Sequence, residues 1–329
     1  GLVSPRPGVG AVIVSKGKII SEGKTRQSPL PHAEAEAIKK INGDLSKATL
    51  YCTLEPHNFN SHDISCTEMI IKSGIKKVSC PKIDTNPKVK GNGFKQLEKE
   101  GIEIITSWGD YQKKQIDELY EAYDFKIKNL RPRIAAKFAM TLDGKISTSN
   151  NESKWITSKE SRNKVHEIRN RCDAIITGIN TIISDDSKLT ARLNNKHTGK
   201  PKYRVVLDNN SKLNNTHEIY KNEDAGKVIW FTSKDVNPTH IPSHITHVNS
   251  KNIKISPLEV IDFLTELGCY EILLESGGSV LGSFFDEKLV DKVYAFIAPS
   301  IFGGIPASSP VEGKGIQNIT DRIKLSNLS

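Results

Sequence analysis

Short apolar runs alternate with amphipathic segments along most of this chain, and this alternation limits the folds open to it. Val9–Val14 is an uninterrupted apolar run that predicts a buried strand, and a second alternation starts with Ile134–Ala139, directly after Arg131-Pro132-Arg133. Strands that alternate with helices favour largely parallel sheets between helices. The 329 residues suffice for two cores. We therefore predict an α/β protein with domains at residues 1–129 and 130–329. We also expect that both ends of the sequence are cut from a longer protein.

Several element boundaries follow from local signals. Pro31 is predicted to open a helix, because a proline at the first helical position loses no hydrogen bond. A helix is expected over 110–129, and Ser158 is expected to cap a helix over 159–170. Residues 209–256 are polar and poorly periodic, so their structure is assigned only loosely.

Composition and charge narrow the class of protein. The formal net charge is +9, but the lysines are spread through the chain without a dense basic block, which argues against nucleic acid as the partner. No apolar stretch is long enough to span a membrane. The five cysteines are scattered and odd in number, so we expect no disulfides and a cytoplasmic location.

One group of residues has the order of a zinc deaminase site. His32 is followed by Glu34, and after a predicted strand over 48–54 come His57 and Cys66. In zinc deaminases three side chains hold the metal, which activates a water, and a glutamate that is not a ligand shuttles protons. We therefore expect His32, His57 and Cys66 to bind Zn²⁺ and Glu34 to be catalytic. Surface histidines and an inert buried cysteine are the alternative interpretation.

A second chemical signal lies at residues 271–282. An apolar strand runs through Glu275 and Ser276 into Gly277-Gly278 and then a helix. Backbone N–H groups at such a helix start bind phosphate, and glycine lets the anion approach. A purely structural strand-to-helix turn has the same pattern, so both interpretations stay open.

Taken together, the two halves resemble the bifunctional deaminase/reductases of riboflavin biosynthesis over nearly the whole chain. The motifs that carry the resemblance are, in chain order, Val9–Val14, Pro31–Glu34, Thr53–Pro56, Cys66–Glu68, Asp84–Pro87, Lys137–Gly144, Ser153–Ser158, Thr181 with Asp185 and Asp186, and Glu275–Gly278. The resemblance implies a cytidine-deaminase-like α/β/α domain followed by a dihydrofolate-reductase-like α/β domain. It implies zinc-dependent deamination of a phosphorylated pyrimidine, 2,5-diamino-6-(5-phosphoribosylamino)pyrimidin-4(3H)-one, and then NADPH-dependent reduction of its ribosyl chain to a ribityl chain. It also implies a homo-oligomer.

Residue roles in the second domain follow from the same resemblance. The positions where the family contacts NADPH are Ala139, Trp155, Thr181, Asp185, Gly277, Gly278, Ser279, Val280, Leu281, Gly282 and Ser283. The positions where it contacts substrate are Ser153, Arg169, Leu189, Arg192 and Glu275. A planar guanidinium suits a phosphate. The alternative interpretation is structural: the two arginines would be solvated surface charges, Trp155 a core residue, and Asp185 a cap or turn residue. Lys137 is expected to steady the ribose or phosphate.

The chain departs from the family at three places in the first domain. Arg6 stands between two prolines where the family has asparagine, and His57 replaces the usual cysteine. The loop over 58–65 lacks the usual glycine and prolines, and its His62 could compete as a ligand. These departures motivate an alternative, in which only the reductase is active and the first domain is structural. A nucleic-acid deaminase is a third hypothesis, which leaves the second half unexplained.

Overall fold

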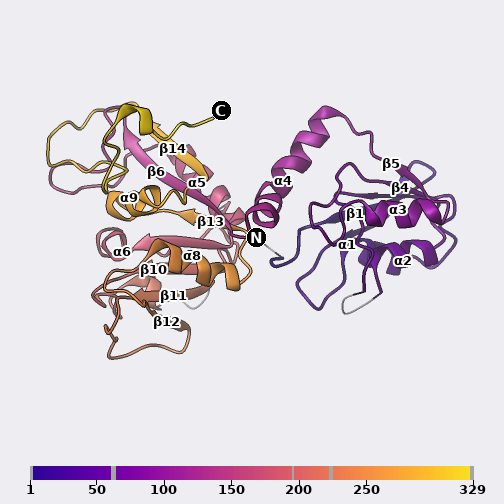
Figure 1. Cartoon of the computed structure of the whole chain (residues 1–329), viewed down its shortest axis with the longest axis horizontal. Coiled ribbons are helices and arrows are strands. Elements are labelled where there is room, and N and C mark those ends of the chain that lie inside the picture. Colours follow the sequence, from indigo (N-terminus) through magenta and orange to yellow (C-terminus); the bar gives the residue numbers. More distant parts are fainter. Residues whose placement is uncertain (1–2, 61–63, 195, 222–224, 327–329) are drawn as a thin grey trace. The chain divides into compact units, whose positions relative to one another are not determined.

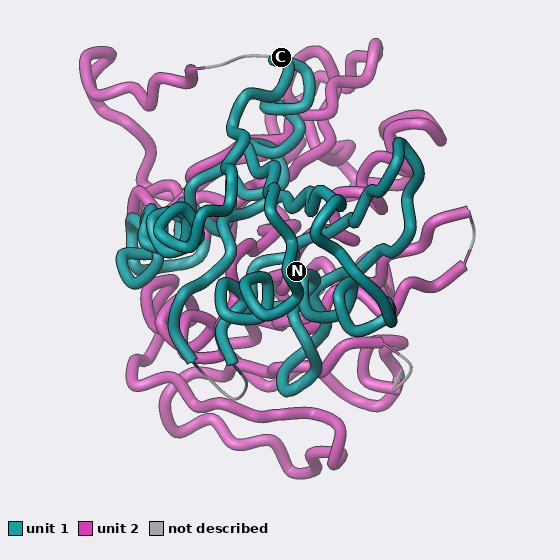
Figure 2. The backbone as a smooth tube through the Cα atoms, turned by 90° about the vertical axis from the view of Figure 1, so that its right-hand side faces the viewer, with its two compact units in different colours: residues 1–132 teal, residues 133–329 magenta. Residues whose placement is uncertain are grey.

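The computed structural model describes residues 3–60, 64–194, 196–221 and 225–326. The chain divides into two compact units, residues 1–132 and 133–329 (Figure 2). The domain boundary predicted at 129/130 falls at the end of a helix that closes the first unit. Both units are α/β, which confirms the predicted fold class.

Unit 1 is built on a five-stranded sheet in the order β2-β1-β3-β4-β5. Its strands are β1 Gly10–Ser15, β2 Lys18–Lys24, β3 Thr49–Cys52, β4 Lys77–Ser79 and β5 Glu103–Ile105. Its helices are α1 Ala33–Lys39, α2 Cys66–Lys72, α3 Asn92–Lys99 and α4 Asp110–Asn129. β1 is antiparallel to both neighbours, whereas β3, β4 and β5 are parallel. The helix predicted over 110–129 is confirmed.

Unit 2 contains a seven-stranded sheet in the order β12-β11-β10-β7-β13-β6-β14, in which neighbouring strands are parallel (Figure 1). The strands are β6 Arg133–Thr141, β7 Ala174–Gly178, β10 Tyr203–Leu207, β11 Lys227–Thr232, β12 Ile245–Asn249, β13 Glu271–Leu274 and β14 Lys292–Ala298. A short hairpin, β8 Arg192–Leu193 with β9 Lys196–His197, lies outside the sheet. β13 lies between β6 and β7, so the order in which successive strands join the sheet reverses at this point.

Helices cover both faces of the unit 2 sheet. They are α5 Lys159–Arg171, α6 Ile179–Asp185, α7 Glu218–Lys221, α8 Pro257–Glu266 and α9 Gly278–Asp286, with a 3₁₀ turn at Ile319–Asp321. Leu264 of α8 and Phe284 of α9 pack in one apolar cluster, and Ile168 of α5 and Ile182 of α6 pack in another. Burial on both faces explains the continuous apolar runs of these strands. Among the described helices, none has the length and apolarity that a membrane crossing requires.

Two local predictions are corrected and one is confirmed. α1 begins at Ala33 rather than Pro31, because His32 is its N-cap with an extended backbone. The loosely assigned region 209–256 contains regular structure, including β12, a strand that the polar composition obscured because only its first residue, Ile245, is buried. Ser158 caps α5 as predicted, since its Oγ accepts the Ser161 N–H at 3.3 Å.

Candidate active sites

Two helix starts and one loop bring three candidate metal ligands together in unit 1. His32 is the N-cap of α1, Cys66 is the first residue of α2, and His57 lies in the loop after β3. Their ligand atoms all lie within 4.8 Å of one another, and Cys66 Sγ is 3.6 Å from His32 Nδ1. Zinc bonds of ~2.1 Å to nitrogen and ~2.3 Å to sulfur at a tetrahedral angle place those atoms about 3.6 Å apart. The three residues therefore fit a zinc ion.

The charge states around this cluster suit metal binding. Burial, and then the neighbouring His32, lowers the pKa of His57 to about 4, so its imidazole is in the neutral form that binds metals. Glu34 lies in the first turn of α1 and is 3 % exposed. Its Oε2 accepts the Cys66 thiol at 3.4 Å, and burial raises its pKa. A buried carboxyl beside the ligand cluster is thus placed to exchange protons there.

Arg6 borders the same site. It lines a small cavity with the three cluster residues, of volume about 20 Å³, room for roughly one water-sized group. Its Nη1 donates to the Leu30 carbonyl at 2.6 Å and its Nη2 to Ser28 Oγ at 3.3 Å. The position at which Arg6 replaces the family's asparagine therefore borders the candidate metal site. His62, named above as a competing ligand, lies outside the described residues.

Glu55 ties the His57 loop to the body of unit 1. Its carboxylate is 3 % exposed and accepts four backbone N–H groups. Oε2 accepts from Asp84 at 3.0 Å and Gly91 at 2.9 Å, and Oε1 accepts from Gly93 at 2.9 Å and Phe94 at 3.2 Å. Three of these donors lie at the start of α3, so Glu55 caps that helix from a distant loop. We call this arrangement the Glu55 clamp.

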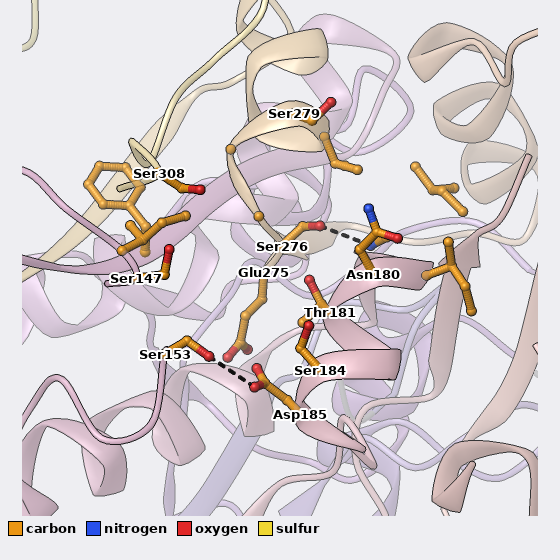
Figure 3. Close-up of a pocket in the computed structure, with 18 of the residues that line it drawn as sticks. Ser147, Ser153, Asn180, Thr181, Ser184, Asp185, Glu275, Ser276, Ser279 and Ser308 are labelled. Carbon is orange, nitrogen blue, oxygen red and sulfur yellow. Dashed lines mark hydrogen bonds between the residues drawn. The ribbon is translucent and has the colours of Figure 1, made fainter. Parts of the chain in front are cut away.

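Two adjoining cavities lie at the carboxyl ends of the unit 2 strands. The larger, about 780 Å³, is bordered by the residues that follow β7, β10 and β13, and we call it the reductase cavity. The smaller, about 390 Å³, shares Lys137, Ser153 and Glu275 with it. Ligands of open α/β sheets bind at such an edge, where the strand order reverses. Figure 3 shows side chains of α6 projecting from one side and the turn at Ser276 from another.

The turn into α9 presents backbone donors to the reductase cavity. α9 begins at Gly278 with no side-chain cap on its first N–H groups. Ser276 Oγ accepts the Gly178 N–H at 2.9 Å, which joins this turn to the end of β7 (Figure 3). A Cβ at Gly278 would collide with the Ser309 carbonyl, whereas one at Gly277 would meet nothing within 4 Å. Uncapped donors beside a cavity of this size fit the phosphates of a nicotinamide dinucleotide.

A buried ion cluster links the two cavities. Arg169 donates through Nε and Nη2 to Glu275 at 2.9 and 2.8 Å, and Lys137 Nζ donates to Glu275 Oε1 at 3.1 Å. Although burial raises the pKa of Glu275, the two cations hold it well below its usual range. Arg169 Nη1 donates to the Thr190 carbonyl at 3.0 Å, so each of the three guanidinium nitrogens donates one hydrogen bond within the protein.

The structure gathers some of the residues expected to contact the cofactor and leaves others aside. Those that line at least one of the two cavities are Ala139, Trp155, Thr181, Asp185, Gly277, Gly278, Ser279 and Val280. The remaining three face elsewhere: Leu281 is in the core, Gly282 packs against Glu312, and Ser283 Oγ donates to the Val280 carbonyl. Within residues 277–283, the cavity contacts therefore come from Gly277 and the first turn of α9.

The residues expected to contact substrate gather around the smaller cavity, which all five line: Ser153, Arg169, Leu189, Arg192 and Glu275. Ser153 Oγ donates to Asp185 Oδ1 at 3.2 Å (Figure 3). Trp155 is not a core residue, since it is 73 % exposed and stacks on Arg162 at 4.5 Å.

Sequence reasoning missed His166, which lines this cavity and whose Nδ1 accepts the Arg192 N–H at 3.3 Å. Burial lowers the pKa of His166 to about 4, which keeps that nitrogen an acceptor. Its position three residues before Arg169 on one helix was the available signal.

Comparison with known proteins agrees with this two-site architecture. The family model of the cytidine and deoxycytidylate deaminase zinc-binding region matches residues 3–82, and that of the RibD C-terminal domain matches residues 132–329. The riboflavin biosynthesis protein RibD of Synechocystis is 35 % identical over 332 residues, which cover 100 % of this chain and 88 % of the relative. That of Actinobacillus pleuropneumoniae is 33 % identical over 99 % of this chain and 86 % of the relative.

The chain belongs to the RibD family of riboflavin biosynthesis proteins. A solved structure from Thermotoga maritima, titled a diaminohydroxyphosphoribosylaminopyrimidine deaminase/5-amino-6-(5-phosphoribosylamino)uracil reductase, superposes with a TM-score of 0.84. It is 34 % identical and covers 99 % of this chain and 89 % of its own. Acinetobacter baumannii RibD superposes with a TM-score of 0.80 at 28 % identity, covering 99 % of this chain and 89 % of its own.

Membership of the RibD family decides between the hypotheses drawn from the sequence. The protein is an enzyme of riboflavin biosynthesis with deaminase and reductase activities. Its first unit carries the zinc-binding deaminase region, and its second is the RibD reductase domain, which implies a nicotinamide cofactor. The reductase-only and nucleic-acid hypotheses are accordingly disfavoured.

Proposed function

We propose that unit 1 deaminates 2,5-diamino-6-(5-phosphoribosylamino)pyrimidin-4(3H)-one and that unit 2 reduces the ribosyl chain of the product to a ribityl chain with NADPH. The relative from Thermotoga maritima is named for both activities and aligns with 99 % of this chain. The observation that carries the proposal is the convergence of His32, His57 and Cys66, with ligand atoms within 4.8 Å, next to the buried Glu34.

In the deaminase site His32, His57 and Cys66 hold the zinc ion, which supplies the Lewis acidity that activates water. Glu34, 3.4 Å from Cys66 Sγ, takes the proton of the attacking water and passes it to the departing amino group. The reaction consumes one water and releases one ammonia. Histidine at position 57 keeps a nitrogen ligand within reach, so the departure from cysteine is compatible with a three-ligand site.

In the reductase site NADPH supplies the hydride. The first turn of α9 holds the cofactor phosphates through backbone N–H groups, and Ala139, Thr181 and Asp185 line its path along the strand ends. The substrate occupies the smaller cavity, where Ser153 and Leu189 shape the wall and Arg192 meets the phosphate. Arg169 acts through Glu275, which it holds as a carboxylate at the junction of the two cavities.

The proposal extends to a cytoplasmic homo-oligomer. All five cysteines are buried and free, which supports a reducing compartment because disulfides are rare there. Sedimentation of the purified chain tests its association state, with a monomer at micromolar concentration as the contrary result.

The test is metal content together with turnover, on the full chain and on His57→Ala. We expect about one zinc per chain in the wild type, lost in His57→Ala, together with loss of ammonia release but retention of NADPH oxidation. His240→Ala, at an exposed histidine of unit 2, is the matched control and should retain zinc. Zinc-free wild-type protein that oxidises NADPH but releases no ammonia would instead support a reductase with a structural first unit.

A further inference from the structure

The reductase cavity contains one cation whose charge the described residues do not neutralise. The charged residues that line it are Lys137, Asp185, Asp208, Lys212, Glu275 and Glu312. Lys137 is ion-paired with Glu275 at 3.1 Å. Lys212 is exposed, and within the described part of the chain its ammonium makes no ion pair or hydrogen bond. A cavity for an anionic cofactor therefore has one uncommitted positive charge at its border.

The loop that carries Lys212 is anchored on both sides. Asp208 directly follows β10, and its Oδ2 accepts the Leu213 N–H at 2.8 Å and the Trp230 Nε1–H at 3.1 Å. The Ser211 N–H donates back to the Asp208 carbonyl at 3.4 Å. With Ser211 and Leu213 both tied to one buried residue, the backbone of Lys212 is held in place at the border of the cavity.

The strand order sets which part of a cofactor reaches this loop. β10 pairs with β7, and β7 pairs with β13, whose end leads into α9. A dinucleotide with its phosphates on the first turn of α9 therefore extends one half along the ends of β7 and β10. From α9 the reductase cavity extends in one direction toward Ser153 and Glu275, where the reaction is expected. In the other direction it extends toward Lys212. The half that reaches Lys212 is then the adenosine half.

The nearby Asp208 is not placed to give the opposite selectivity, a preference for NADH. A carboxylate at a strand end that binds the ribose 2′-hydroxyl is the usual device for NADH, and it repels a 2′-phosphate. Asp208 occupies a strand end, but its side chain is wholly buried. Its Oδ2 is hydrogen-bonded to Leu213 and Trp230, and its Oδ1 is enclosed without a hydrogen-bond partner among the described residues. The enclosed carboxylate is a loop anchor, and Lys212 is the charge presented to the ligand.

We propose that Lys212 binds the 2′-phosphate of NADPH and makes the reductase select NADPH over NADH. This inference rests on the proposed reductase function and adds the residue that sets cofactor choice. An ammonium is an effective point-charge partner for a phosphate, and NADH lacks the group that it would meet.

The experiment measures the dissociation constants of NADPH and NADH by calorimetry on the full chain. For Lys212→Ala we expect the constant for NADPH to rise about tenfold, as for loss of one charged hydrogen bond, and that for NADH to change less than twofold. Lys212→Glu should weaken NADPH binding further. Lys234→Ala is the matched control, since Lys234 is exposed, follows the neighbouring strand β11 and lies outside both cavities.

A second experiment uses adenosine nucleotides without nicotinamide, so that only binding of the adenosine half is measured. Adenosine 2′,5′-bisphosphate should bind the wild type more tightly than adenosine 5′-phosphate does, and Lys212→Ala should erase that difference. Equal weakening of NADPH and NADH by Lys212→Ala, or no effect on either, would overturn the assignment of Lys212 and leave the reductase proposal intact. Wild-type protein that binds neither nucleotide would refute the reductase proposal itself.

Discussion

The Glu55 clamp is expected to support both the stability of unit 1 and its metal site. In Glu55→Gln the side chain keeps its shape, but one oxygen becomes an NH₂ group that faces two backbone N–H donors. The remaining oxygen still accepts from one pair, either Asp84 with Gly91 or Gly93 with Phe94. The other two buried donors lose their acceptor.

The size of the effect follows from those two donors. Leaving a buried N–H without an acceptor costs about 1–3 kcal/mol, so two of them predict a loss of about 2–6 kcal/mol in the unfolding free energy of unit 1. Loss of the negative charge beside the start of α3 adds to this. Glu55→Ala removes all four hydrogen bonds, and with ordinary domain stabilities of about 5–15 kcal/mol we expect that variant to leave unit 1 largely unfolded.

Urea unfolding of the full chain, followed by hydrogen exchange of peptides from residues 84–99, measures this effect. Zinc affinity by chelator competition provides a second readout, because His57 lies two residues beyond Glu55, and we expect a loss of about 10- to 100-fold in Glu55→Gln. Glu98→Gln, at an exposed position on α3, is the matched control and should shift stability by less than about 0.5 kcal/mol. If Glu55→Gln behaved like this control in both assays, the clamp would be unimportant and the reasoning wrong.

Three further variants test the other charges. Glu34→Gln cannot exchange a proton, so ammonia release should fall about 100- to 10,000-fold while zinc content stays at the wild-type level; loss of zinc would point to a structural role. Glu275→Gln leaves the buried Arg169 without its anion, which should cost about 3–5 kcal/mol in urea unfolding of unit 2, whereas a shift below about 1 kcal/mol would contradict the ion cluster. Hydrogen bonds from Arg26 lower the pKa of Glu36 from 4.5 to about 2, so the stability it adds is complete above pH 4.5 and is lost as pH falls to about 2. Arg26→Gln should flatten that acid dependence in thermal melts, and an unchanged slope would exclude Glu36 as its source.

The α/β class and both chemical sites were predictable because they depend on local patterns. Apolar runs bounded by turn residues mark strands whether or not the rest of the chain is known. His32, His57 and Cys66 were predicted as one cluster because a zinc deaminase needs soft ligands at helix starts and after a strand, and the structure brings these three together. The turn at Gly277 was recognisable because paired glycines between an apolar strand and a helix leave backbone N–H groups open to an anion.

Pairings between distant segments could not be predicted, since they depend on which strand ends become neighbours. Glu55 and the start of α3 are separated by more than thirty residues, and only the parallel pairing of β3 with β4 brings them together. The role of Arg169 at the substrate stays a prediction, but its pairing with Glu275 could not be predicted, because it follows from the insertion of β13 beside β7. β12 was missed for a related reason, because an edge strand exposes enough polar side chains to hide its period.

The sequence by itself determined the kinds of element, the chemistry of the deaminase cluster and the family to which the chain belongs. These are properties of single segments, and residue types limit them directly. Only the tertiary structure decided which charges are neutralised within the protein and which are left for a ligand. Arg169 and Lys212 are both basic residues in the sequence, yet one is buried against Glu275 and the other borders the reductase cavity with its charge unpaired among the described residues. That difference arises because the order of strands in the sheet, which the local pattern does not encode, sets the neighbours of every side chain at its carboxyl edge.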